Sequence, residues 1–201
     1  MFYYTNKFKI GFLLVFCSLL FSNCKKGKDD PSISLLSRKT RLTGEWNMTR
    51  GNANFTYRES GQPTINQAFS FQGASLTLNE TETSGPPIIY TGSYTLWLKM
   101  GKKGEFEMTE NLNGSIFSAS GTWNFTGKVG ENKNKEEVVF IINSVRTGAS
   151  NEHLFNKLRT EFTYKLIALH NKEIVLESAT KTYLNSNGSS TSYSSGYSFK
   201  Q

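Results

Sequence analysis

The chain has 201 residues, a formal net charge of +7 and 2 cysteines, of which Cys17 lies in an apolar N-terminal run. With so few cysteines, we expect neither a disulfide framework nor a thiolate metal site, and the fold must be held by its own core. Of the three densest lysine groups, one lies at residues 25–28, and those at residues 99–103 and 128–135 are interleaved with glycine, asparagine and glutamate in turn-like segments. The lysines are not gathered on one stripe with aromatic residues, so we expect no nucleic-acid partner.

Residues 1–23 have the order of charge and apolarity that is typical of an export signal. Lys7 and Lys9 precede an apolar run over residues 10–21. A run of about a dozen apolar residues suits the central region of a secretory signal and is too short to span a bilayer. Cys24 follows Ser22-Asn23 directly and is followed by lysines and aspartates. This arrangement resembles the lipobox of a bacterial lipoprotein, in the looser form used by the Bacteroidota.

The lipobox resemblance implies that residues 1–23 are removed as a lipoprotein signal peptide. It also implies that Cys24 then carries fatty acyl groups, palmitate among them. The expected location is the cell outer membrane, on its periplasmic or cell-surface face, with the membrane contacted through acylated Cys24. The alternative is an ordinary cleaved signal, in which Cys24 is an incidental thiol. Residues 24–41 are short of large apolar side chains and are predicted to be a flexible tether.

Beyond the tether, residues 42–201 are dominated by a hydrophobic period of two. In residues 88–100 the apolar side chains take one parity and mostly polar side chains take the other, so a pleated strand places them on opposite faces. The same alternation recurs in further segments, namely residues 69–71, 76–78, 106–108, 117–125, 162–168 and 193–199. Residues 138–142 are continuously apolar and are predicted to be covered on both faces.

Glycine, asparagine, serine and proline fill the gaps between these segments, as hairpin connections require. The gaps lie at residues 85–87, 101–104, 127–134, 171–172 and 185–190. Many short strands predict an all-β fold in the form of an antiparallel up-and-down meander. This meander is expected to close into a barrel of about eight or more strands or to fold as a sandwich. Only residues 151–160 fit a short helix of a turn or two, or else a loop.

Two segments repeat a pattern, G-x-W-N-x-T, at residues 44–49 and 121–126. We expect Gly44 and Gly121 to let a strand bend or another backbone approach, and Trp46 and Trp123 to cover the end of the core. Together with Gly92-Ser93-Tyr94, these motifs resemble the lipocalin-like lipoproteins of the Bacteroidota, a largely uncharacterised group. The resemblance implies a lipocalin-like barrel over residues 42–201. The T-D-Y motif and the last-strand arginine of classical lipocalins are both missing, so a classical lipocalin ligand site is not implied.

A barrel of about eight strands is either filled by its own side chains or holds one small ligand. The residues predicted to line such a pocket are Tyr90, Tyr94, Leu96, Leu98, Phe106, Phe117, Phe140 and Phe162. Two functions follow. The first, favoured by the resemblance, is binding of a small apolar or amphipathic ligand inside the barrel. The second is a cell-envelope interaction or scaffold protein with a filled barrel, which docks a protein or glycan through its outer surface.

Convergent titratable groups of the kind that catalysis needs are not evident in the sequence. The two histidines, His153 and His170, lie in or beside predicted loops without metal-ligand spacing, and we expect both to be solvated. No nucleophile elbow or phosphate loop occurs, so we expect no enzyme activity, catalytic residue, metal or cofactor. Three tyrosines of the serine-rich C-terminal hairpin are predicted to lie on a half-exposed edge strand or to form a contact surface: Tyr183, Tyr193 and Tyr197.

Overall fold

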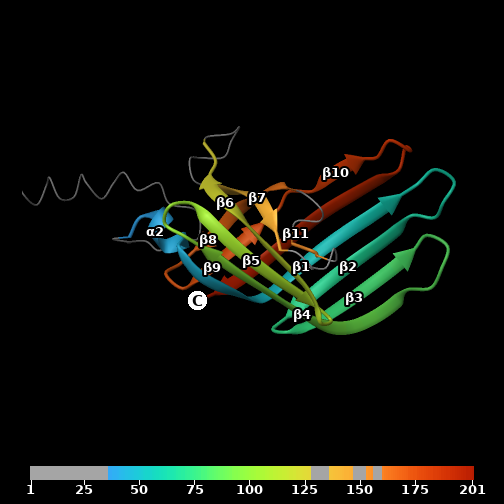
Figure 1. The fold of residues 1–201 in the computed structure, drawn as a ribbon. Helices are drawn as coiled ribbons and strands as arrows, with labels where there is room; N and C mark the ends of the chain where they lie inside the picture. The colour runs from blue at the N-terminus through green and yellow to red at the C-terminus, as the bar shows by residue number, and fades with distance from the viewer. Residues whose placement is uncertain (1–35, 128–135, 147–152, 156–159) are drawn as a thin grey trace, which may run out of the picture.

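The structure, a computed structural model, describes residues 36–127, 136–146, 153–155 and 160–201 as a nearly all-β fold (Figure 1). A short helix, α2 (Arg38–Leu42), precedes the strands. The strands are β1 (Gly44–Arg58), β2 (Ile65–Gln72), β3 (Ser75–Glu82), β4 (Ile88–Met100), β5 (Glu105–Leu112), β6 (Ser115–Phe125), β7 (Glu137–Val145), β8 (Glu161–Leu169), β9 (Glu173–Glu177), β10 (Lys181–Leu184) and β11 (Ser190–Lys200). The predicted signal peptide, the lipid attachment at Cys24 and most of the tether lie outside the described residues.

All strand pairs are antiparallel and follow one another along the chain from β1 to β9, and β11 then returns to β1. At the start of β1, Gly44–Asn47 pairs directly with Trp97–Met100 of β4, so the β2–β3 hairpin is inserted only along the far part of β1. Strands β1, β4 to β9 and β11 therefore close a ring at that end. This confirms the predicted all-β meander with barrel-like closure.

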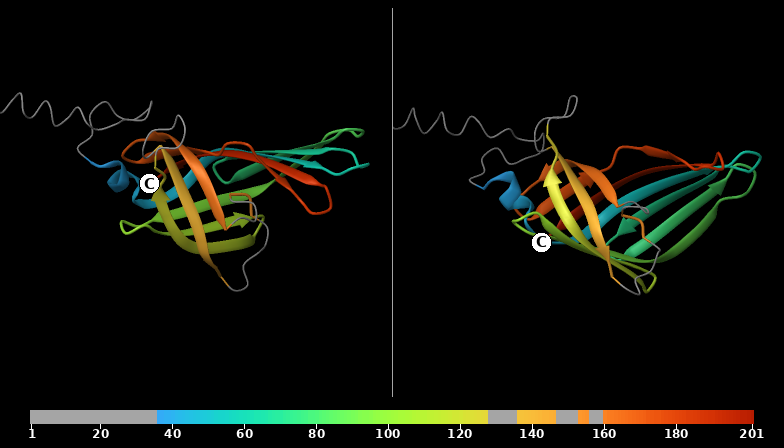
Figure 2. Two further views of the ribbon diagram at one scale, coloured as in Figure 1. Left: turned by 90° about the horizontal axis from the view of Figure 1, so that it is seen from above. Right: turned by 45° about the horizontal axis from the view of Figure 1, so that its top comes forward.

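Beyond the ring, the sheet continues as an open extension that we call the apron. It consists of β2, β3 and β10 with the parts of β1, β4 and β11 that pair with them. Figure 2 shows the apron projecting from the ring on the side away from α2. The apron explains why Ile88 and Tyr90 are exposed although they share the inward parity of β4: they lie past the ring, whereas the inward side chains from Tyr94 to Met100 are buried.

Helix α2 covers the end of the ring opposite the apron. Ser37 caps it by accepting a hydrogen bond from the Thr40 amide (3.1 Å). Arg38 and Arg41 are buried, and the Arg41 guanidinium donates to the carbonyl of Leu169 at the end of β8. The prediction that the flexible tether reaches residue 41 is therefore wrong, because arginine stems supply apolar packing that a count of large hydrophobic side chains overlooks.

Both tryptophans of the repeated motif lie at the end of the ring that α2 covers. Trp46 is fully buried and its indole N–H donates to the Leu42 carbonyl (2.9 Å). Trp123 donates to the Gly101 carbonyl (3.1 Å) in the β4–β5 turn, and the Lys39 ammonium lies 5.8 Å from its ring centroid. The motif thus places two large side chains over one end of the core.

The glycine of the second motif is required by a close backbone contact. A Cβ atom on Gly121 would lie 1.9 Å from the carbonyl oxygen of Ile141 on β7. The β6–β7 register shifts between Ser120 and Gly121, which is the irregularity that such an approach produces. In the first motif, Gly44 has a φ of +146°, which L-residues rarely adopt.

The predicted alternation holds for the central strands. Odd positions of β6 from Phe117 to Trp123 and even positions of β8 from Phe162 to Ala168 face the core. The prediction that residues 138–142 are covered on both faces is wrong, since Ile141 is 41% exposed. Only one face of β7 packs on the core, because within the described chain no second layer covers the outside of the ring.

Candidate functional site

Inside the ring, the side chains that the structure describes pack into one core cluster. Seven of the eight residues predicted to line a pocket are buried in one core cluster, namely Tyr94, Leu96, Leu98, Phe106, Phe117, Phe140 and Phe162. They contact one another: the ring of Phe140 lies 5.3 Å from that of Phe106 and 5.2 Å from that of Phe162. Tyr90, the eighth, is 47% exposed on the apron. The predicted lining therefore forms packing contacts in this structure.

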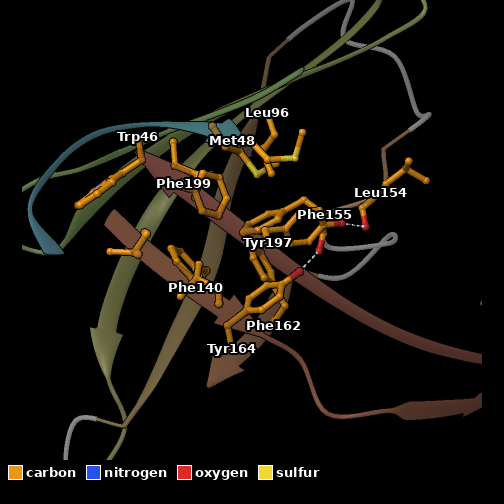
Figure 3. Close-up of a cluster of buried hydrophobic side chains, with 14 of the residues drawn as sticks. Trp46, Met48, Leu96, Phe140, Leu154, Phe155, Phe162, Tyr164, Tyr197 and Phe199 are labelled. Atoms are coloured by element: carbon orange, nitrogen blue, oxygen red, sulfur yellow. Dashed lines mark hydrogen bonds between the residues drawn. The ribbon is translucent and has the colours of Figure 1, made fainter. Parts of the chain in front are cut away.

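A segment between β7 and β8 completes the filling. Residues His153, Leu154 and Phe155, which we call the plug, are all buried, and Phe155 is inaccessible to solvent. Figure 3 shows Phe155 pointing into the aromatic cluster, where its ring centroid lies 4.9 Å from Tyr164 and 5.3 Å from Phe162. The plug is not helical. Most of the predicted helix or loop at residues 151–160 lies outside the described residues.

The first residue of the plug corrects a prediction. His153 was expected to be solvated, but it is buried and stacks on Phe117 with ring centroids 4.2 Å apart. The sequence carried no sign of this, because a single histidine in a polar segment has no periodicity that would indicate burial. His170, by contrast, is half-buried in the β8–β9 turn.

Tyrosine hydroxyls hold the carbonyl groups of the plug. The Tyr193 hydroxyl lies 2.9 Å from the carbonyl oxygens of both Leu154 and Phe155. Tyr164 donates to the Phe155 carbonyl, and Tyr197 contacts the Leu154 carbonyl more weakly at 3.4 Å. These three hydroxyls therefore satisfy backbone oxygens that would otherwise be buried without hydrogen bonds.

A buried carboxylate holds the amide groups of the same segment. Glu110 of β5 is inaccessible to solvent, and its Oε1 accepts hydrogen bonds from the amides of Leu154 and Phe155, both at 2.9 Å. The Tyr94 hydroxyl donates to the same oxygen. Burial of a carboxylate is tolerated only with such donors, so Glu110 and the plug each depend on the other.

The prediction of a half-exposed strand for the C-terminal tyrosines is wrong for two of them. Tyr193 and Tyr197 are buried, while Tyr183 on β10 is partly exposed. The reason is topological: β11 lies between β1 on one side and β9 and β10 on the other, so it is not an edge strand. Their shared parity with Phe199, from which they are six and two residues away, was the available signal that they face the core.

Burial shifts the ionisation of these phenols. It raises the pKa of Tyr193 to about 12, although hydrogen bonds with Ser195, Tyr164 and Tyr197 act to lower it. Burial also raises the pKa values of Tyr94, Tyr164 and Tyr197 well above the usual 10, and the charge of Glu110 adds to the rise at Tyr94. All four phenols are therefore neutral in the folded protein at physiological pH.

These shifts predict a loss of stability at alkaline pH. Because the folded-state pKa lies above the unfolded value, the stabilising contribution is complete below about pH 10 and is lost as the pH rises through the folded-state pKa. We expect tyrosinate absorbance from the four buried phenols, Tyr94, Tyr164, Tyr193 and Tyr197, to appear together with the loss of near-ultraviolet circular dichroism. Their smooth titration while that signal stays folded would contradict the buried assignment.

The outer face of the sheet carries a groove of about 590 Å³ where the ring passes into the apron. Its lining includes amide and hydroxyl side chains from β1, β2 and β11, namely Asn52, Asn54, Ser70, Gln72, Ser194 and Ser198. Arg50 and Glu177 are its charged members, and Ile167 and Val175 add apolar surface. Gly196 is part of the lining, and a Cβ atom there would lie 2.9 Å from Asn52 Oδ1. The missing side chain thus leaves the floor of the groove open.

One of the two functions predicted from the sequence uses the outer surface for docking, but that prediction named none of the amide and hydroxyl residues given above. These residues have the outward parity of their strands, which is typical of an ordinary solvated face. Only the three-dimensional bend of the sheet makes that face concave. The arrangement offers many neutral hydrogen-bond donors and acceptors and one charge of each sign, which suits a neutral polar ligand.

Within the described ranges, two other kinds of feature are absent. There, no group of three or more histidine, cysteine, aspartate or glutamate side chains is placed to hold a metal ion. None of the helical structure described there is long and apolar enough to cross a membrane. No family model, curated protein or solved structure matches the chain.

Proposed function

We propose that this protein is a lipid-anchored, lipocalin-like envelope protein that binds a neutral saccharide in the groove on its outer face. The carrying observation is the contrast between the two surfaces of the sheet. The inner surface is occupied by the core and by the plug, whereas the outer surface holds a groove of about 590 Å³ whose lining includes many amides and hydroxyls. That volume lies in the usual range of small-molecule sites.

The chemistry of the lining supports a sugar rather than an ion or an apolar compound. Amide and hydroxyl side chains both donate and accept hydrogen bonds, as sugar hydroxyls do. Arg50 is already engaged, because its Nε donates to Ser198 Oγ at 3.3 Å. The alternative, a small apolar ligand inside the barrel, requires the plug to leave, since Leu154 and Phe155 are buried within the core cluster.

The groove is tested with a double substitution, Asn52→Ala and Asn54→Ala. A neutral hydrogen bond contributes about 0.5–1.5 kcal/mol, so loss of two should weaken binding by about tenfold. The measurement is titration calorimetry with the strongest binder from a panel of neutral oligosaccharides. The matched control is Asn79→Ala, which lies exposed on the outer face of the apron and does not line the groove. Failure of the whole panel, or an equal loss in the control, would refute the proposal.

The anchor belongs to the same proposal and is tested separately. We expect the protein produced in a bacterial host to incorporate labelled palmitate and to partition into detergent, and the Cys24→Ser protein to do neither. The described chain starts beside α2, at the end opposite the apron (Figure 1). An acyl chain on Cys24 would therefore hold the α2 end nearest the membrane. Equal labelling of both proteins would remove the anchor from the proposal and leave the groove unaffected.

A further inference from the structure

The first part of β4 is a free edge of the apron. Residues 88–93 pair with β3 on one side. Strand β5 joins the other side only from Tyr94, which pairs with Leu112 where β5 ends. Among the residues that the structure describes, no strand pairs with residues 88–92 on that side.

The direction of the unpaired backbone groups follows from the neighbouring hydrogen bonds. The Tyr94 amide donates to the Ala74 carbonyl (3.0 Å), on the β3 side. Ser93 faces the opposite side, where its amide donates to Asn113 Oδ1 (2.8 Å) and its carbonyl accepts from the Asn113 amide (3.0 Å). Backbone groups alternate along a strand, so the N–H and C=O of Thr91 and Ile89 also point to the free side.

This edge lacks the usual protection against pairing. Natural sheets place charges, especially lysine, on exposed edge strands. Residues 83–95 contain no Asp, Glu, Lys or Arg, and Ile88, Ile89 and Tyr90 are 61%, 69% and 47% exposed. The other edge of the apron, β10, is only four residues long and begins with Lys181. The β4 edge is therefore the more favourable place for another strand to add.

We propose that this edge pairs with the same edge of a second copy of the chain, antiparallel about a two-fold axis at Tyr90. In that register Ile89 pairs with Thr91 of the second copy and Thr91 with Ile89 of the second copy, giving four backbone hydrogen bonds. Ile88 lies across from Gly92 of the second copy, which carries no side chain, and Asn113 Oδ1 and the Tyr90 ring lie beside the place where its Cβ atom would be. The contact is the same on both copies and closes on itself, so it ends at a dimer.

The limits of the edge match this register. Pro87, which has no N–H, lies across from Ser93 of the second copy, whose backbone groups are already bonded to Asn113. The N–H that Pro87 lacks is therefore not needed for a hydrogen bond in this register. The chain has a net charge of +7, but residues 83–95 are uncharged, so two copies of this segment bring no like charges together at the axis. A second copy is therefore favoured over an unrelated charged peptide.

The test uses the full chain with Cys17→Ser and Cys24→Ser, which removes both cysteines and any association through acyl chains. Tyr90 faces itself as a non-hydrogen-bonded pair, with a Cα separation of about 4.5 Å, which a disulfide can span. Adding Tyr90→Cys should therefore give a disulfide-linked dimer on mild oxidation. Adding Ile89→Cys instead should not, because that residue faces Thr91 of the second copy. Equal linkage of both variants would overturn the register.

Sedimentation velocity over a range of concentrations tests the dimer itself in the same background. We expect a monomer–dimer equilibrium that Ile89→Lys shifts toward monomer by at least tenfold in the dissociation constant. Thr91→Pro removes an N–H that points to the free side and should also shift the equilibrium toward monomer. Circular dichroism should show that the Ile89→Lys and Thr91→Pro variants remain folded. Lys181→Ala, on the opposite edge, should leave the equilibrium unchanged. If the protein with the unchanged edge stays monomeric at every concentration, the proposal is overturned. The same holds if its edge binds foreign peptides but no second copy.

Discussion

Replacing Phe155 with alanine is expected to lower the free energy of unfolding by about 3–5 kcal/mol, the usual loss when a buried phenylalanine is truncated. Phe155 is inaccessible to solvent and contacts aromatic rings from β7, β8 and β11, including Phe140 and Tyr197. The measurement is equilibrium urea unfolding followed by tryptophan fluorescence. The control is Leu184→Ala, because Leu184 is 82% exposed and should change stability by no more than about 0.5 kcal/mol.

The same variant distinguishes a filled barrel from a hollow one. If Phe155 fills the interior, an environment-sensitive apolar dye should give no response with the wild-type protein. Removal of the ring should then create an apolar cavity that takes up a small apolar probe, since such cavities stay dry and bind apolar guests. Dye binding by the wild-type protein with a loss of less than about 1 kcal/mol in the variant would show that the plug is not part of the core.

Replacing Glu110 with leucine should destabilise the protein by about 3 kcal/mol or more. The substitution leaves the Tyr94 hydroxyl and the amides of Leu154 and Phe155 without their acceptor, and each buried donor so abandoned costs about 1–3 kcal/mol. Glu110→Gln is the matched variant, because its amide oxygen can still accept from the plug. Both are measured by urea unfolding, and we expect the glutamine variant to retain most of the stability.

A different ranking of the two variants would identify what Glu110 contributes. If leucine were tolerated as well as glutamine, the hydrogen bonds to the plug would carry little of the stability, and apolar filling would account for it. If both were equally harmful, the charge itself would be required. Only a clear difference in favour of glutamine agrees with Glu110 serving as the acceptor for the plug amides.

The strand pattern was predictable because a strand that is buried on one face has apolar residues at every second position. The inward residues follow that period in β6 from Phe117 to Trp123 and in β8 from Phe162 to Ala168, after which Leu169 is buried out of phase. The same period could not show where β4 leaves the ring, since Tyr90 and Tyr94 have the same parity but only Tyr94 is buried. A change from closed to open sheet depends on the pairing of distant strands and leaves the local alternation unaltered.

The candidate sites were harder to predict, for a related reason. The plug is held by backbone groups of Leu154 and Phe155, and hydrogen bonds to the main chain place little demand on side-chain type. Glu110 has an inward position on β5 but reads as one acidic residue among several. The groove gathers side chains from several strands around Gly196, and no single-strand pattern describes how distant strands come together.

The closure of the ring joins opposite ends of the polypeptide, since β1 pairs with β11 from Asn47 to Arg58. A protein delivered across a membrane from its N-terminus would present β1 long before its final neighbour emerges. Contacts between such distant segments slow folding, and β-rich domains of this kind fold over milliseconds to seconds. Until then the aromatic side chains of β1 and β2 would remain uncovered, so the export that we propose would make maturation depend on holdase chaperones that shield them.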